Sequence, residues 1–191
     1  MTTAYQPEDE NYLHEQVQQQ QESGGLPGFV VARLTYFLVS YADQDAKGWV
    51  FGADTDFKLP GLEGTLQPDV AFVTSARLAF PDRNTVAVAP DLAVEVFSKT
   101  DSEYDMTDKV KDYLQAGVKM IWVVRLPAKL IEVHTQQHSA KPLLLGAGEI
   151  IEGAEVLPGF QLAVDDIFIR LPPEALSAAN PRRSNRKAQA E

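Results

Sequence analysis

A single acidic residue, Glu95, stands in the middle of an otherwise apolar, strand-forming run at residues 91–97. Continuous apolar runs of this length are typical of a strand that is covered on both faces of a sheet. A carboxylate in such a strand is costly to bury unless it is paired, and a bound cation is the commonest strong partner. The chain is therefore expected to form a covered sheet that holds a charged group and its partner inside it.

A second acid, Asp69, opens another short apolar run directly after Pro68. Two acids, each on or at the start of a strand, outline a metal site, because hard divalent cations prefer carboxylate oxygens. The alternative for Glu95 is an ion pair with a lysine or arginine, and the alternative for Asp69 is a Pro-Asp turn that leads into a strand. The interpretation of Asp69 as a ligand therefore depends on that of Glu95.

The composition limits the kind of protein that the chain can be. Its 191 residues, 45% of them hydrophobic, suffice for one domain with a full core. The net charge of −10 argues against extensive unspecific contact with a nucleic acid but does not exclude DNA binding. Without cysteine the chain has no disulfide framework and no thiolate metal site, and a cytoplasmic location fits best.

Other classes of protein and site are also disfavoured. No run of about 18 apolar residues occurs, so no membrane-spanning helix is expected. The acidic N-terminal segment lacks the apolar core of a secretory signal. The three histidines, His14, His134 and His138, have no spacing typical of metal ligands, and all three are interpreted as surface residues.

Three parts are expected along the chain. Residues 1–25 are predicted to form a polar arm or a solvated helix, residues 26–170 the folded domain, and residues 171–191 a flexible tail. The segment 23–27, which contains serine, glycine and proline, is expected to break the chain. An amphipathic helix is expected to follow at residues 29–42, where apolar residues recur on one helical face.

The rest of the domain alternates strand patterns with turns and contains one more helix. Residues 103–116 predict this helix, with Asp101 and Asp105 capping its start and Gly117 ending it. The expected fold class is α/β, a single domain with a mixed β-sheet flanked by helices. Strands are expected at residues 48–51, 56–59, 69–73, 91–98, 120–124, 130–134, 149–151 and 160–164.

The ordered series of polar residues resembles a known family. Asp69 in LQPDVAFV, Glu95 in APDLAVEVFS, and Lys109 and Tyr113 on the following helix are similar in order and spacing to the putative restriction endonuclease domain family. This bacterial group is part of the PD-(D/E)XK nuclease superfamily, and the resemblance extends over residues 49–168. It implies a restriction-endonuclease-like fold for the domain.

The resemblance also implies a function, namely metal-dependent hydrolysis of DNA phosphodiester bonds. Asp69, Glu95 and the carbonyl of Val96 would bind Mg²⁺, for which Mn²⁺ can substitute. A lysine would then assist the attacking water. DNA is the expected substrate, and a homodimer is one candidate for the active form, because cutting both strands of a duplex needs two sites.

The position of the lysine departs from the superfamily pattern. The lysine usually follows the glutamate by two residues, where this chain has Phe97. The family's Lys-x-x-x-Tyr pattern instead matches Lys109 and Tyr113, which are four residues apart and so share a helix face. Lys99 and Lys111 are competing candidates, although Lys111 would lie roughly 200° round the helix from Lys109. The expected site consists of the catalytic residues Asp69, Glu95 and Lys109, with Tyr113, Ser98 and Phe97 as its walls.

Two other functions remain open at this point. Family members commonly carry a further glutamate near the N-terminus, for which Glu15 and Glu22 are the candidates here. Loss of that acid would favour a non-catalytic binding module that keeps the nuclease fold. The remaining alternative is a metal-dependent hydrolase of a smaller phosphate ester, which an acidic protein would suit.

Overall fold

The computed structural model describes most of the chain. Two expectations, the flexible tail at residues 171–191 and the candidate Lys99, lie outside the described residues. Side chains are described from residue 25 onward. The described backbone comprises residues 7–59, 61–78, 85–98, 101–138 and 141–168.

Six strands form one mixed sheet in the order β1-β3-β5-β6-β7-β8. Only β5 and β6 run parallel to each other, and the other neighbouring pairs in this sheet are antiparallel. The mixed sheet flanked by helices that the sequence predicts is confirmed. The strands are β1 (Gly48–Gly52), β3 (Val70–Thr74), β5 (Leu92–Phe97), β6 (Met120–Arg125), β7 (Leu130–Thr135) and β8 (Leu143–Leu145).

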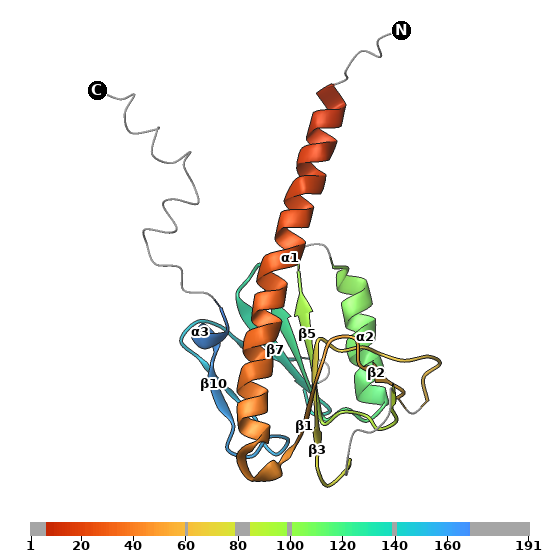
Figure 1. Cartoon of the computed structure of the whole chain (residues 1–191), viewed down its shortest axis with the longest axis vertical. Helices are drawn as coiled ribbons and strands as arrows, with labels where there is room; N and C mark the ends of the chain where they lie inside the picture. Colours follow the sequence, from red (N-terminus) through yellow and green to blue (C-terminus); the bar gives the residue numbers. More distant parts are fainter. Residues whose placement is uncertain (1–6, 60, 79–84, 99–100, 139–140, 169–191) are drawn as a thin grey trace, which may run out of the picture.

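Two helices, α1 (Pro7–Ala42) and α2 (Glu103–Gln115), lie on opposite sides of the sheet (Figure 1). Alternate residues of a strand point to opposite faces, so each central strand contributes to both sides. The core on the α1 side includes Val30, Leu34, Leu38, Val94, Val96 and Trp122. The core on the α2 side includes Ala93, Phe97, Met106, Val110, Ile121 and Val123.

The break expected at residues 23–27 is wrong. Helix α1 continues through this segment with Pro27 inside it, so the helical alternative holds for the part of the arm that the structure describes. Proline removes one backbone hydrogen bond and crowds the preceding turn, but its fixed φ is compatible with a helix. Downstream, Val30 and Leu34 are fully buried against the sheet. Tertiary packing of this face therefore supports a helix that local sequence preference would end.

One segment of α1 bears on the expectation that no helix spans a membrane. Within the described part of the chain, Gly25–Ala42 is long and apolar enough by length and composition for such a span, with a mean hydropathy of 1.2. The segment contains one charged residue, Arg33, so it is not an uninterrupted apolar run, but its mean hydropathy is still high enough for a membrane span. The face with Leu34 and Leu38 packs on the sheet, as in a core helix of a folded domain.

Six short elements complete the described fold. Strand β2 (Asp56–Phe57) pairs in parallel with β4 (Thr85–Val86), and β9 (Ile150–Glu152) pairs antiparallel with β10 (Gln161–Ala163). A 3-10 turn at Gln44–Ala46 follows α1, and α3 (Val164–Ile167) follows β10. Strands β4 and β8 were not predicted from the sequence.

The structure differs from the sequence prediction at the N-terminal cap of α2 and agrees with it at the C-terminal end. Its N-cap is Ser102, whose hydroxyl accepts a hydrogen bond from the backbone N–H of Asp105 at 3.3 Å. Neither aspartate is the cap, because Asp101 instead accepts from the backbone N–H of Ser98. Asp105 lies in the first turn of α2, where its charge favours the helix dipole as expected. The C-terminal prediction is confirmed, since Gly117 adopts a φ of +92° just beyond the helix.

A buried carboxylate, Asp91, ties the start of β5 to its neighbours. Its Oδ1 accepts from Nη1 of Arg77 at 3.0 Å and lies 2.8 Å from Nζ of Lys119. Its Oδ2 accepts from the backbone N–H of Thr74 at 2.9 Å. Burial raises the pKa of Asp91, but the bonds from Lys119, Thr74 and Arg77 together outweigh it and hold this pKa below its ordinary value.

The variant Asp91→Asn is expected to lower the free energy of unfolding by about 2 kcal/mol at neutral pH, because two cations lose their charged partner. The native pKa of Asp91 lies below that of the unfolded chain. Its contribution is therefore present above the unfolded pKa of about 3.9 and is lost as the pH falls through the native pKa. Urea unfolding at several pH values measures this difference. A gap between variant and wild type that stays constant into strong acid would refute the assignment.

Candidate active site

Glu95 lies on the face of β5 that α2 covers. Along the sheet, its register partner on β6 is Val123, and Val123 in turn lies opposite Glu132 on β7. The residue is only 4% exposed. The carboxylate is therefore buried in a strand covered on both faces, and its partners must come from the protein or from a bound ion.

Both carboxylate oxygens of Glu95 accept hydrogen bonds from α2. Lys109 Nζ donates to Oε2 at 2.7 Å, and Tyr113 Oη donates to Oε1 at 2.7 Å. The spacing of four residues places the two donors on one helix face, as the sequence indicates. Tyr113 is fully buried, whereas the side chain of Lys109 is 30% exposed. Of these two donors, only the lysine has a path to solvent.

The pKa shifts at the site show that burial disfavours the ionised form of Glu95. Burial raises the pKa of Glu95, because desolvation outweighs the opposing effects of Lys109 and Tyr113, and the charge of Asp69 raises it further. Burial also raises the pKa of Tyr113, with the charge of Glu95 and their hydrogen bond adding to it. The phenol of Tyr113 thus stays protonated and can donate its hydrogen bond. Lys109 and Tyr113 do not fully offset the burial of the Glu95 charge, so a further cation would stabilise the ionised carboxylate.

Asp69 directly precedes β3, which pairs with β5. Its Oδ2 accepts a hydrogen bond from the backbone N–H of Val96 at 2.7 Å. Because the N–H and C=O of one strand residue point to the same side, the carbonyl of Val96 is also directed toward β3. Burial raises the pKa of Asp69, while the bond from Val96 and the charge of Lys109 oppose this rise. Lys109 therefore acts electrostatically on both carboxyl groups.

The donor set at this site suits a hard divalent cation. Asp69 and Glu95 offer carboxylates and Val96 offers a carbonyl, and Mg²⁺ is commonly held by one or two carboxylates together with water. In the described ranges, no group of three or more His, Cys, Asp or Glu side chains is arranged to hold a metal ion. Glu15 and Glu22, the candidates for a third acid, lie where the structure describes no side chains.

Lys111 and Phe97, the other described positions considered for the catalytic lysine, have different contacts. Lys111 has a side chain that is 60% exposed, and its Nζ lies 2.8 Å from Asp108 on the same helix. Phe97, at the usual lysine position, is 6% exposed and lies beneath Arg125, whose guanidinium carbon is 4.2 Å from the ring centroid. The residue that contacts Glu95 is Lys109, the one that the family pattern indicates.

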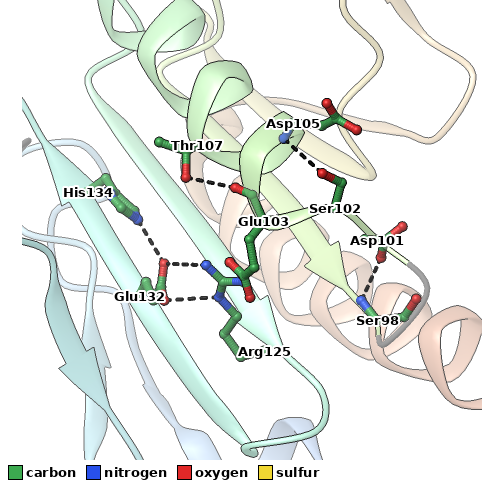
Figure 2. Close-up of polar contacts among 9 residues, drawn as sticks. All are labelled: Ser98, Asp101, Ser102, Glu103, Asp105, Thr107, Arg125, Glu132 and His134. Carbon is green, nitrogen blue, oxygen red and sulfur yellow. Dashed lines mark hydrogen bonds and ion pairs between the residues drawn. The ribbon is translucent and has the colours of Figure 1, made fainter.

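A second polar network, which was not expected from the sequence, joins Glu103, Arg125, Glu132 and His134 (Figure 2). Arg125 donates from Nε to Glu132 Oε1 at 2.9 Å and from Nη1 to Glu103 Oε2 at 2.7 Å. His134 Nε2 lies 3.1 Å from Glu132 Oε2. The network thus connects the first turn of α2 with β6 and β7. The alternation of β7 could have revealed it, because Glu132 and His134 are two residues apart and share a face.

The interpretation of His134 as a surface residue is wrong, since it is 8% exposed. The strand alternation that suggested exposure is real, but α2 covers the face on which the polar residues lie. The hydrogen bond from His134 lowers the pKa of Glu132, and Arg125 adds to this effect against the influence of burial. His138, by contrast, is exposed as expected, and the side chain of His14 is not described.

The mixed sheet with a helix on each side is a nuclease-like α/β fold. A crystal structure of a putative nuclease belonging to DUF820 from Anabaena variabilis matches with a TM-score of 0.67 at 15% sequence identity. The match covers 75% of this chain and 80% of that chain, and it shows a shared fold. No protein with a curated description matches the chain.

The family of the chain is shown by the comparison of its sequence with known protein families. The chain belongs to the Uma2 family, described as putative restriction endonuclease, whose model matches residues 3–165. The family predicted from the order of Asp69, Glu95, Lys109 and Tyr113 is thereby confirmed. The matched region also includes the whole of α1, which lies before the segment that carries the sequence resemblance.

Proposed function

We propose that the protein is a metal-dependent endonuclease that hydrolyses phosphodiester bonds in DNA. The observation that carries this proposal is the buried Glu95, held by Lys109 and Tyr113 and electrostatically coupled to a second carboxylate, Asp69. Folding alone does not require such a group, because a well-packed apolar residue often stabilises a core at least as well. Membership of a family described as putative restriction endonuclease supports a nuclease role.

Asp69, Glu95 and the carbonyl of Val96 would hold Mg²⁺, or Mn²⁺ in its place. When bound, such an ion polarises a phosphate oxygen and lowers the pKa of a coordinated water. Lys109 would stabilise the charge that develops on the phosphate or orient the attacking water. Its flexible four-carbon stem and partial exposure allow its ammonium group to reach a substrate.

A nicking assay tests this proposal. The purified protein is expected to nick supercoiled plasmid DNA in the presence of Mg²⁺ or Mn²⁺ and to lose this activity with a chelator. Asp69→Asn should lower the rate by about a hundredfold, because it removes one of two carboxylate ligands. Lys111→Met is the matched control on α2, since Lys111 is exposed and pairs only locally with Asp108. Nicking by Asp69→Asn at the wild-type rate would contradict the assigned ligand.

The active form is a second element of the proposal. One site cuts one strand, so we also propose that a homodimer makes the double-strand break. Sedimentation at the protein concentration used for cleavage tests this. A monomer that linearises plasmid in a single binding event would exclude it.

A non-catalytic binding module is the second candidate, and two observations favour it. The net charge is −10, and the described site offers two carboxylates rather than three. Calorimetric titration separates the two functions, because the module predicts no binding of Mg²⁺ or Mn²⁺. DNA binding without metal binding or cleavage would support the module.

A further inference from the structure

We propose that the two donors on Glu95 play different parts toward a metal ion. Tyr113 is a fixed positioning residue on Oε1, whereas Lys109 is an exchangeable cation on Oε2 that a divalent metal ion displaces. This inference rests on the proposed function, since it concerns the same metal site. It adds a role for Tyr113 and a link between metal binding and the release of the lysine.

The first step concerns the oxygen that Lys109 contacts. Its ammonium nitrogen lies 2.7 Å from Oε2 of Glu95. A divalent ion held by the same oxygen would bring a second positive charge beside this ammonium group. Two neighbouring cations repel each other strongly in a partly buried site. Lysine and metal therefore compete for Oε2.

The second step concerns which donor can leave. The side chain of Lys109 is 30% exposed, so its flexible stem can carry the ammonium group into solvent or toward a substrate. Tyr113 is fully buried among the apolar residues of α2 and the sheet, and its ring has no comparable route. The phenol is therefore expected to keep its bond to Oε1 and to hold the carboxylate in place while Oε2 exchanges its partner.

The third step is the charge balance of the site. Lys109 acts on both Glu95 and Asp69, so one positive charge serves two carboxylates. A divalent ion matches both of them and makes the lysine unnecessary as their partner. The released ammonium group remains at the edge of the site on α2. One residue can thus neutralise Glu95 before metal binds and act on water or phosphate afterwards.

The test is Mn²⁺ affinity, measured by titration calorimetry on the full chain at mildly alkaline pH. Lys109→Met is expected to tighten Mn²⁺ binding about tenfold, because a competing charge-assisted hydrogen bond is removed. Tyr113→Phe is expected to weaken it about tenfold, in the range found for groups that orient metal ligands. The two changes on one carboxylate thus have opposite signs, which general destabilisation of the fold would not produce.

Two matched controls accompany these variants. Lys111→Met removes a lysine from the same helix, and Tyr41→Phe removes a buried hydroxyl whose partner is the carbonyl of Pro158 on the α1 side. Both should leave Mn²⁺ affinity within about twofold of wild type. Weaker or unchanged binding by Lys109→Met would overturn the exchange. Unchanged binding by Tyr113→Phe would overturn the positioning role.

The failure of this inference differs from a failure of the proposed function. A wild-type protein that binds no Mn²⁺ sinks both, whereas binding that neither variant alters sinks only the inference. Cleavage adds a second distinction, since Lys109→Met should bind metal more tightly and yet cleave poorly. Tyr113→Phe should need more metal but recover most of its rate at saturation.

A measurement on the wild type avoids any variant that fails to fold. In lysine-labelled protein, the ε-methylene resonance of Lys109 is expected to shift when Mg²⁺ is added, because its ammonium group leaves Glu95. The resonance of Lys111 should stay in place and serves as the internal control. Saturation with Mg²⁺ without a shift at Lys109 would refute displacement.

Discussion

Replacement of Glu95 by glutamine is expected to lower Mg²⁺ affinity by more than about a hundredfold and to abolish plasmid nicking. Glutamine keeps the size of the side chain and can still accept a hydrogen bond from Tyr113, but it lacks the charge that holds a hard cation. Loss of groups that merely orient metal ligands costs about 10- to 100-fold, so loss of a direct carboxylate ligand should cost more. Calorimetry measures the affinity, and the nicking assay measures the rate.

This loss is expected without a loss of stability. Burial raises the pKa of Glu95 above that of the unfolded chain, so the ionised group opposes folding at neutral pH. Glutamine removes that charge, and thermal unfolding should therefore occur at the wild-type temperature or above it. Glu132→Gln is the matched control, because Glu132 lies on the same face two strands away and pairs with Arg125. Nicking that survives Glu95→Gln would remove the basis of the proposed function.

The largest loss of stability is expected from Trp122→Ala, at about 3–5 kcal/mol in the free energy of unfolding. Trp122 is fully buried in the centre of β6, and its ring centroid lies 5.8 Å from that of Phe160. Alanine would leave a cavity between the sheet and the segment that carries Phe160. The midpoint of thermal unfolding should fall by about 10 °C in a chain of this length. Scanning calorimetry measures both quantities.

Trp122→Phe provides the control for this substitution. Within the described residues the indole N–H of Trp122 has no hydrogen-bond partner, so phenylalanine forfeits no bond there and leaves a smaller cavity. It should cost less than half as much as alanine. Equal losses for the two variants would show that cavity size does not determine stability at this position.

The residues whose spacing alone carries meaning could be predicted from the sequence. Glu95 is conspicuous because it interrupts an apolar run, and Lys109 and Tyr113 are four residues apart, which is enough to place them on one helix face. Their contact with Glu95 then follows once α2 packs on the face of β5 that carries this carboxylate. These inferences need only local periodicity and one packing contact.

The remaining features depend on packing that the sequence does not display. Pro27 lies inside α1 because buried residues beyond it hold the helix on the sheet. His134 is buried because α2 covers a face that strand alternation alone marks as polar. Strand β4 has two residues and β8 has three, too few for a periodic signal, and each is ordered by its neighbour.

The parallel pairing of β5 with β6 has a consequence for how the site forms. Two parallel neighbours need a crossover connection, and here that connection is α2, so β5, α2 and β6 form one βαβ unit. Glu95, Lys109 and Tyr113 all lie within this unit, and one short connection separates Glu95 from the helix that carries the other two residues, so bringing them together costs little entropy. They meet as soon as that one unit folds. Asp69 joins them only when β3 pairs with β5, so this pairing is expected to complete the proposed metal site.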